Sequence, residues 1–199
     1  MATSSTSQLA PKSLYIGYDD PKELGYICSI DHVASVLNNG LLPIEKVHRV
    51  GMQLFDPSNS EVKERRTNNK DHIDHYVSLY LQPYNRILYR IYEQNKKICV
   101  LRVHPKILKK DGCLIADRNP SAPGVQFEQA EKFTFDQVSS HILHDKDSMI
   151  FSNDLRKKYG IRIDENLARQ IREAAVLVPS NIPSIYVKGI YVPNKEIKK

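Results

Sequence analysis

The sequence groups its strand-forming segments in blocks, and this grouping limits the possible folds more than any other feature. Residues 76–81, 87–92 and 98–103 are rich in aromatic and β-branched side chains and are separated by polar breaks. Such segments are typical of strands. Residues 176–178 and 184–192 have the same character near the end of the chain. Because these blocks do not alternate regularly with helical patterns, we expect an α+β fold with a mostly antiparallel sheet.

One amphipathic helix is predicted near the start of the chain. Ile30, Val33 and Leu37 fall on one face after Ser29, and Gly40 stands where a helix commonly ends.

A second helix is predicted from about Asp164, because Leu167 and Ile171 are spaced by four residues. Between the two helices, residues 111–135 mix Gly, Pro, Asn and Asp and are expected to form loops.

The length of 199 residues suits one domain, with 41% hydrophobic and 26% charged residues as in ordinary globular chains. Residues 1–12 are rich in Ser and Thr and are expected to be a flexible tail, which leaves residues 13–199 as the domain. No apolar run is long enough to span a bilayer, and the start of the chain has no apolar core typical of a secretion signal. We therefore expect a cytoplasmic protein that does not bind membranes.

The chain carries a net charge of +6, which favours a phosphate-bearing partner without proving one. Arg156, Lys157 and Lys158 form part of one basic cluster, and the chain has 11 tyrosines, several of them near basic clusters. Aromatic rings beside cations hold single-stranded nucleic acid by stacking and charge. The alternative is a solvated basic face with tyrosines in the core.

Several common catalytic and metal-binding motifs are absent. The chain contains no GxGxxG, GxxxxGK[ST], GxSxG or HExxH motif. Two HxxH pairs, His72 with His75 and His141 with His144, are weak signals, and no metal is expected. The three cysteines are far apart in sequence, which favours reduced thiols over a disulfide framework.

Five segments in a fixed order together resemble the DarT family of NAD-dependent ADP-ribosyltransferase toxins. They lie between about residues 26 and 192. The segments are residues 30–42, 62–66, 75–89, 100–119 and 174–183.

The resemblance implies an ADP-ribosyltransferase fold in which two packed, mostly antiparallel sheets hold NAD in a cleft. It implies a toxin that transfers ADP-ribose from NAD to a nucleobase of single-stranded DNA, with an antitoxin as its expected protein partner. RNA as the target remains an alternative, as does a module that binds NAD or nucleic acid without catalysis.

The resemblance also places the catalytic glutamate of the family at the position of Ala175. Three explanations stay open: an introduced inactivating substitution, a natural pseudo-enzyme that still binds, or a shifted register in which Glu173 is the catalyst. Residues two apart on a strand share a face, so Glu173 would reach the cleft if it were on the strand. Otherwise Glu173 is a surface helix residue beside Arg172.

Further site residues follow from the resemblance alone. Arg65 would be the catalytic arginine and would hold either the diphosphate of NAD or the incoming base. Arg66 is the second choice and a candidate nucleic-acid contact. Tyr80 and Ile87 would form the wall of the nicotinamide and ribose site, with plain core packing as the alternative.

Two departures from the family pattern are expected on the adenosine side of NAD. Tyr26 and Cys28 occupy positions where many members carry His and Thr.

Asn119 would position a loop that meets the target strand, with an ordinary Asn turn as the alternative.

Overall fold

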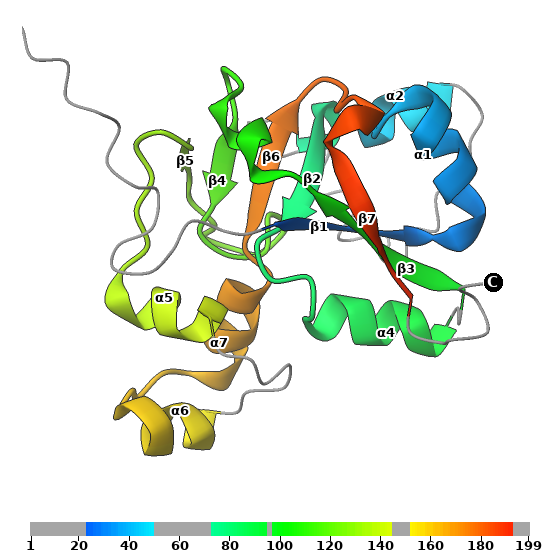
Figure 1. The fold of residues 1–199 in the computed structure, drawn as a ribbon. Coiled ribbons are helices and arrows are strands. Elements are labelled where there is room, and N and C mark those ends of the chain that lie inside the picture. Colours follow the sequence, from blue (N-terminus) through cyan, green and yellow to red (C-terminus); the bar gives the residue numbers. More distant parts are fainter. Residues whose placement is uncertain (1–22, 50–72, 95–96, 145–151, 193–199) are drawn as a thin grey trace, which may run out of the picture.

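The computed structural model describes residues 23–49, 73–94, 97–144 and 152–192. The expected tail at residues 1–12 lies outside this part. Among the described residues, the helical elements alternate with seven strands (Figure 1). The strands are β1 (Leu24–Ser29), β2 (Tyr76–Tyr80), β3 (Ile98–Val103), β4 (Leu114–Ala116), β5 (Phe127–Gln129), β6 (Ala175–Pro179) and β7 (Val187–Tyr191). The α-helices are α1 (Val33–Asn39), α2 (Ile44–Arg49), α4 (Arg86–Gln94), α5 (Gln137–His144), α6 (Ser152–Tyr159) and α7 (Glu165–Arg172). The 3-10 turns are η1 (Ile30–His32), η2 (Ile73–His75), η3 (Pro105–Lys109) and η4 (Ser184–Tyr186).

The seven strands form one sheet in the order β5-β4-β6-β2-β1-β3-β7, and every ladder is antiparallel. The predicted α+β class and antiparallel sheet are therefore confirmed. The expectation of two separate sheets is wrong, because β1 and β2 join two halves into one sheet. That join is narrow, with Gly25 opposite Tyr80 as its ladder pair. By contrast, β1 pairs with β3 along its full length, from Leu24 opposite Val103 to Ser29 opposite Ile98.

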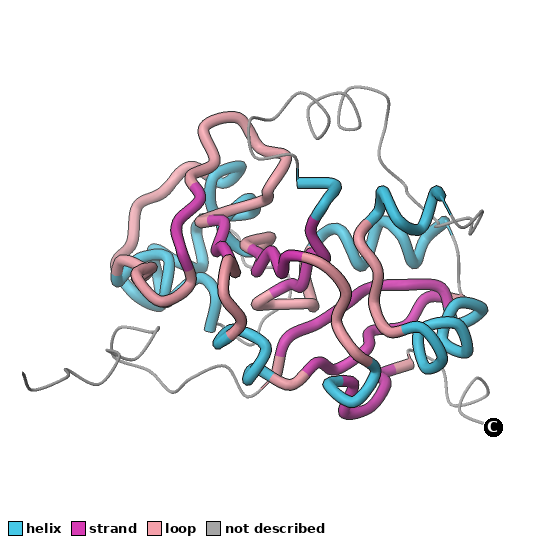
Figure 2. The backbone as a smooth tube through the Cα atoms, turned by 90° about the horizontal axis from the view of Figure 1, so that it is seen from above, coloured by secondary structure: helices cyan, strands magenta, loops and turns pink. Residues whose placement is uncertain are grey.

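Buried aliphatic side chains from the middle strands form the centre of the molecule. Leu24, Leu79, Leu101 and Val176 are at most 1% exposed and belong to one core cluster. Seen from above in Figure 2, helices flank the strands on several sides. Burying this apolar surface is the main stabilising contribution to the fold.

The segment at residues 87–92 is helical, so its prediction as a strand is wrong. Asn85 is fully buried, and its Oδ1 accepts hydrogen bonds from the backbone N–H groups of Ile87 at 3.0 Å and Leu88 at 3.2 Å. This is an N-cap, which starts α4 at Arg86. The spacing of Leu88 and buried Ile91 then favours a helix, although the residues themselves prefer strands.

Two other segments also differ from expectation. Residues 111–135 were expected to be loop, but they contain the short strands β4 and β5, which pair with each other. Three-residue strands between glycines and prolines give too little periodicity to be recognised. Residues 184–192 begin with the turn η4 before β7 starts. The predicted helices near residues 30 and 164 and the strands at 76–81, 98–103 and 176–178 are confirmed.

All three cysteines of the chain are buried and unoxidised. Cys113 donates its S–H to the carbonyl of Ile107 at 3.4 Å, and burial raises the pKa of Cys113 to about 11. An unfolded chain loses this proton at lower pH than the folded one, so alkali favours unfolding.

We therefore expect the free energy of unfolding to fall by about 2 kcal/mol between pH 9 and pH 11 on account of Cys113. Urea unfolding in a reducing buffer measures this, with the Cys113→Ala variant as the control. The variant should lose less stability over the same pH range. Equal losses in both proteins would contradict the assignment.

Candidate active site

The end of α7 places a buried carboxylate just before β6, a central strand of the sheet. Glu173 is the C-cap residue of α7, and β6 begins two residues later at Ala175. The Glu173 side chain is only 1% exposed, so the surface-helix alternative for this residue is wrong. Glu173 lies at the helix end and not on the strand, so the alternation rule for strands does not link it to position 175.

Two donors hold the Glu173 carboxylate. Asn119 Nδ2 donates to Oε2 at 2.6 Å, and Arg86 Nε donates to Oε1 at 3.4 Å. A buried carboxylate is costly unless it is hydrogen-bonded and paired, and these partners provide both. The carboxylate therefore links α7, the loop after β4 and the start of α4.

Asn119 forms the Asn turn that was one of its two predicted roles, and its role in a loop that meets the target strand stays a prediction. Its Oδ1 accepts from the backbone N–H of Ser121 at 2.8 Å, which is the bond of an Asn turn. Its own backbone N–H donates to the Gln170 carbonyl at 2.8 Å. These bonds fix the side chain so that its amide reaches Glu173.

Ala175 lies between two strands and is fully buried. In the antiparallel ladders it is opposite Tyr80 of β2 and opposite Ala116 of β4. Residues directly opposite in a ladder project to the same face of the sheet. The methyl groups at 116 and 175 and the Tyr80 ring therefore project from one face, and of the two residues opposite Ala175 only Tyr80 has a larger side chain.

Tyr26 lies close to this group on β1. Burial raises the pKa of Tyr26 above its usual value, and the nearby Cys28 and Tyr80 shift it in the same direction. Tyr26 also packs against the core cluster. Because Gly25 is the residue opposite Tyr80, the Tyr26 side chain projects to the other face of the sheet, and its contact with a cofactor stays a prediction.

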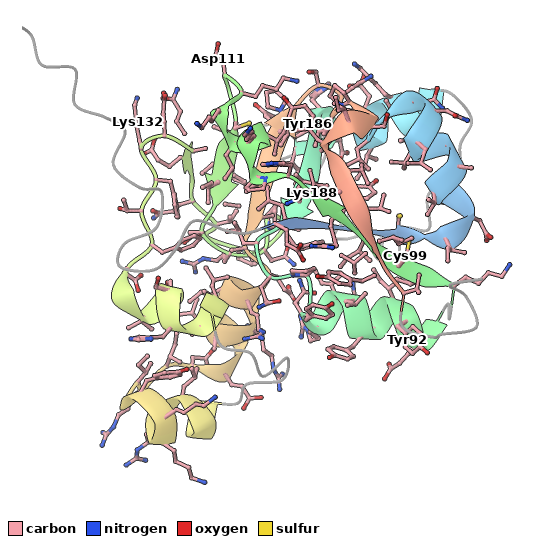
Figure 3. All side chains as sticks on the ribbon, viewed as in Figure 1. Tyr92, Cys99, Asp111, Lys132, Tyr186 and Lys188 are labelled. Carbon is pink, nitrogen blue, oxygen red and sulfur yellow. The ribbon has the colours of Figure 1, made fainter. Side chains whose placement is uncertain are left out.

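Cys28 points into the core. It is 7% exposed, and its sulfur lies 3.7 Å from that of Cys99, which is its ladder partner on β3 (Figure 3). The hydrogen-bonded contact with Cys99, together with burial, raises the pKa of Cys28. This thiol is a packing residue in the described structure, and its contact with a cofactor stays a prediction.

The remaining predicted site residues are distributed differently. Ile87 lies on α4 and not on a strand, and its place in the wall of the nicotinamide and ribose site stays a prediction. Arg65 and Arg66 lie outside the described residues. Arg156, Lys157 and Lys158 are exposed on α6, and in Figure 1 α5 and α7 lie between α6 and the sheet.

The histidine pairs do not converge in the described part of the chain. His75 pairs with Glu45, and His141 stacks on the Tyr159 ring with centroids 4.7 Å apart. Within residues 23–49, 73–94, 97–144 and 152–192, no group of three His, Cys, Asp or Glu residues is arranged to hold a metal ion.

Sequence reasoning missed Arg86 as a site residue. The signal was present, because Asn85 precedes an amphipathic spacing as an N-cap does. The strand prediction for residues 87–92 hid this cap. As the first residue of α4, Arg86 extends its guanidinium toward Glu173 while remaining half-exposed.

The role of Glu173 in the fold can be tested by comparing two substitutions. Glu173→Ala leaves the half-buried amide of Asn119 without its acceptor, so we expect a loss of about 2 kcal/mol in the free energy of unfolding. Glu173→Gln retains an acceptor oxygen and should lose less. Urea unfolding gives both values, and Glu131→Ala, at an exposed carboxylate, should change stability by under about 0.5 kcal/mol. Equal losses for Ala and Gln at 173 would show that the hydrogen bond to Asn119 does not matter.

The fold matches solved structures of one class of enzyme. Thermosipho africanus DarTG in complex with ADP-ribose aligns with a TM-score of 0.68 at 24% identity, covering 88% of this chain and 45% of that one. Thermus sp. 2.9 DarT in complex with ADP-ribosylated ssDNA aligns with a TM-score of 0.66 at 17% identity, covering 94% and 87%. The same DarT in complex with NAD+ aligns with a TM-score of 0.60 at 18% identity, covering 90% and 86%. The fold is that of the DarT ADP-ribosyltransferases.

Sequence comparison then identifies the family. The family model for the ssDNA thymidine ADP-ribosyltransferase DarT matches residues 26–199, and the chain belongs to this family. A DNA ADP-ribosyl transferase–DNA ADP-ribosyl glycohydrolase fusion protein of Thermosipho africanus (strain H17ap60334) is 28% identical over 185 residues, or 88% of this chain. The chain spans 44% of the length of that curated relative. The family resemblance read from the five segments is confirmed.

One finding bears on the expected absence of membrane contact. In the part of the chain that is described, no helix is both long and apolar enough to cross a bilayer.

Proposed function

We propose that this chain is a DarT-type ADP-ribosyltransferase domain whose catalytic acid position is occupied by Ala175. The reaction would break the bond between nicotinamide and ribose of NAD and join the ribose carbon to thymidine in single-stranded DNA. The observation that carries this proposal is the position of Ala175 at the start of β6, on the same sheet face as Tyr80. A carboxylate at this place would stabilise positive charge developing on the ribose.

Glu173 is a poor substitute for the absent acid. Its oxygens are already bonded to Asn119 and Arg86, and it is buried at the end of a helix. To act on a substrate it would have to give up those bonds without an equivalent replacement. We therefore assign Glu173 a positioning role that holds Asn119 and Arg86 beside the site.

The chemical types of the side chains present suit a dinucleotide. Tyr80 offers aromatic surface and a phenol group for the ribose and nicotinamide side, and Tyr26 offers the same groups for the adenosine side. Arg65 and Arg86 offer guanidinium groups, which suit a diphosphate because they donate to two oxygens together. NAD would supply the ADP-ribosyl group. The chain's own residues would orient it and exclude water.

The single-stranded DNA substrate would also require positive charge. Arg66, Arg156, Lys157 and Lys158 are the proposed phosphate contacts away from the reacting sugar. The three residues on α6 are exposed and lie in its last turn.

Incubation with NAD and thymidine-containing oligonucleotides, followed by mass spectrometry, tests the function. If the Ala175→Glu variant adds ADP-ribose to DNA but not to RNA, the result supports the proposal. No gain on either polymer by a folded variant would favour the second candidate, a module that binds without catalysis. The observation that favours a binding module is the alanine at position 175.

We also propose a protein partner that removes the modification. The curated relative joins a transferase to a DNA ADP-ribosyl glycohydrolase in one chain. An active form of this chain should therefore be tolerated in cells only when such a hydrolase is co-expressed. Equal growth with and without the hydrolase would contradict this partnership.

A further inference from the structure

Three tyrosines and three arginines form an exposed surface next to the candidate active site, and we name it the tyrosine surface. It consists of Tyr84, Tyr89, Tyr191, Arg86, Arg90 and Arg102. The tyrosine side chains are 42%, 39% and 37% exposed, respectively. Exposed aromatic side chains that gather in one place often mark a binding surface.

The members of this surface lie close together. The Tyr84 and Tyr191 rings are 6.2 Å apart, and the Arg102 guanidinium lies 5.0 Å from the centre of the Tyr191 ring. Burial raises the pKa of Tyr84, and Tyr191 and Tyr89 act in the same direction, as expected for close neighbours. Figure 1 shows α4 running beneath β3 and β7, so the helix and the strands contribute to one patch.

The sequence of α4 explains which side chains face outward. Arg86, Tyr89, Arg90 and Glu93 are exposed and recur at intervals of three and four, whereas Ile91 is buried. The outer face of the helix therefore presents an aromatic ring between two guanidinium groups.

The loop that carries Tyr84 is held in place by several hydrogen bonds. Its backbone N–H donates to Gln82 Oε1 at 3.2 Å, and its carbonyl accepts from Arg172 Nε at 3.4 Å. Arg172 is itself buried and donates from Nη1 to the Ile142 carbonyl at 2.9 Å. The ring of Tyr84 is thus presented by a fixed backbone, which lowers the entropy cost of binding.

Arg86 connects the tyrosine surface to the candidate active site, because its guanidinium also bonds to Glu173. Acidic groups at the patch are Glu23, which is bonded to Arg102 and to the Tyr191 hydroxyl, and Glu93 on α4. With Glu173 counted, three carboxylates match the three arginines, and the Glu173 carboxylate is buried.

We propose that the tyrosine surface is the stacking platform for the single-stranded DNA bases that flank the modified thymidine. This inference rests on the proposed function and adds the surface that the substrate follows. Aromatic rings stack on any base, and guanidinium groups contact the phosphates between them. Paired bases in a duplex would not be available for this stacking.

Fluorescence anisotropy with a labelled 12-nucleotide thymidine oligomer tests the proposal without requiring catalysis. Tyr84→Ala should weaken binding about five-fold or more, whereas Tyr84→Phe keeps the ring and should bind within about two-fold of the unaltered chain. Arg90→Glu should weaken binding to all single strands and reduce its dependence on salt concentration. Ile185→Ala removes an exposed apolar side chain outside the patch and serves as the control.

Three results would overturn the platform. These are unchanged affinity in Tyr84→Ala and Arg90→Glu, equal weakening by Phe and Ala at position 84, or duplex DNA binding as tightly as the single strand. Thermal melting of each variant separates a binding defect from unfolding. If Tyr84→Ala loses binding and a folded Ala175→Glu variant transfers no ADP-ribose, the platform is supported and the proposed reaction is refuted. If Ala175→Glu transfers ADP-ribose and Tyr84→Ala binds the oligomer as tightly as the unaltered chain, the proposed reaction is supported and the platform is refuted.

Discussion

The substitution Ala175→Glu is expected to raise the rate of ADP-ribose transfer to single-stranded DNA by about 10²–10³-fold over the unaltered chain. This is the range by which a single electrostatic group at the reacting atoms changes catalytic rates. The new carboxylate would start from a backbone position opposite Tyr80 and Ala116, on the face that carries their side chains. Quantitative mass spectrometry of a thymidine oligonucleotide incubated with NAD measures the rate.

The matched control is Ala175→Gln, which has the same size and shape but no charge. Position 175 is fully buried, so either long side chain must be accommodated by its neighbours. Both variants should lose similar stability in thermal melting, but only the glutamate variant should gain activity. Equal rates for two folded variants would show that position 175 does not carry the catalytic charge.

The second large effect concerns Gly40, which ends α1. Its φ of 76° and ψ of −176° lie in a region that is essentially restricted to glycine. An added Cβ would lie 2.3 Å from the backbone carbonyl oxygen of Ile182, which accepts the hydrogen bond of Leu41. Gly40→Ala should therefore lower the free energy of unfolding by about 3 kcal/mol or more, because backbone strain and a backbone clash act together.

Differential scanning calorimetry should show this as a fall of roughly 6–12 °C in Tm, given about 2–4 °C per kcal/mol at this chain length. Gly124→Ala is the control, because Gly124 also has a positive φ of 71° but an added Cβ meets no atom within 4 Å. It should show the backbone strain alone, about 1 kcal/mol. Equal Tm shifts in the two variants would show that the contact with Ile182 does not matter.

Much of the fold could be predicted where one periodicity dominates. The strands at β2, β3 and β6 and the helix α7 carry clear patterns, and Asp164 caps α7 by accepting from the backbone N–H of Leu167 at 2.9 Å. At α4, β-forming residues compete with helical spacing, and the cap formed by Asn85 decides the outcome. Such competition is resolved by hydrogen bonds that composition does not reveal.

The candidate site was predictable only in part, for a related reason. Ala175, Tyr80 and Tyr26 were named as site residues through the family resemblance alone, and no strand was predicted at Leu24–Ser29, which carries Tyr26. The bond between Asn119 and Glu173 joins residues 54 positions apart, and the partnership of Arg86 with Glu173 joins residues 87 apart. Neither pairing has a local signature, because each depends on how loops and helix ends meet after folding. The tyrosine surface is likewise assembled from α4, the loop before it and β7.

A crystal structure of the unaltered chain soaked with NAD+ tests the central claim most directly. The account predicts an intact dinucleotide with its nicotinamide ribose within about 4 Å of the Ala175 methyl group, beside the Tyr80 ring. It also predicts that Glu173 keeps its bonds to Asn119 and Arg86. A dinucleotide bound elsewhere, with position 175 still enclosed by protein atoms, would contradict it.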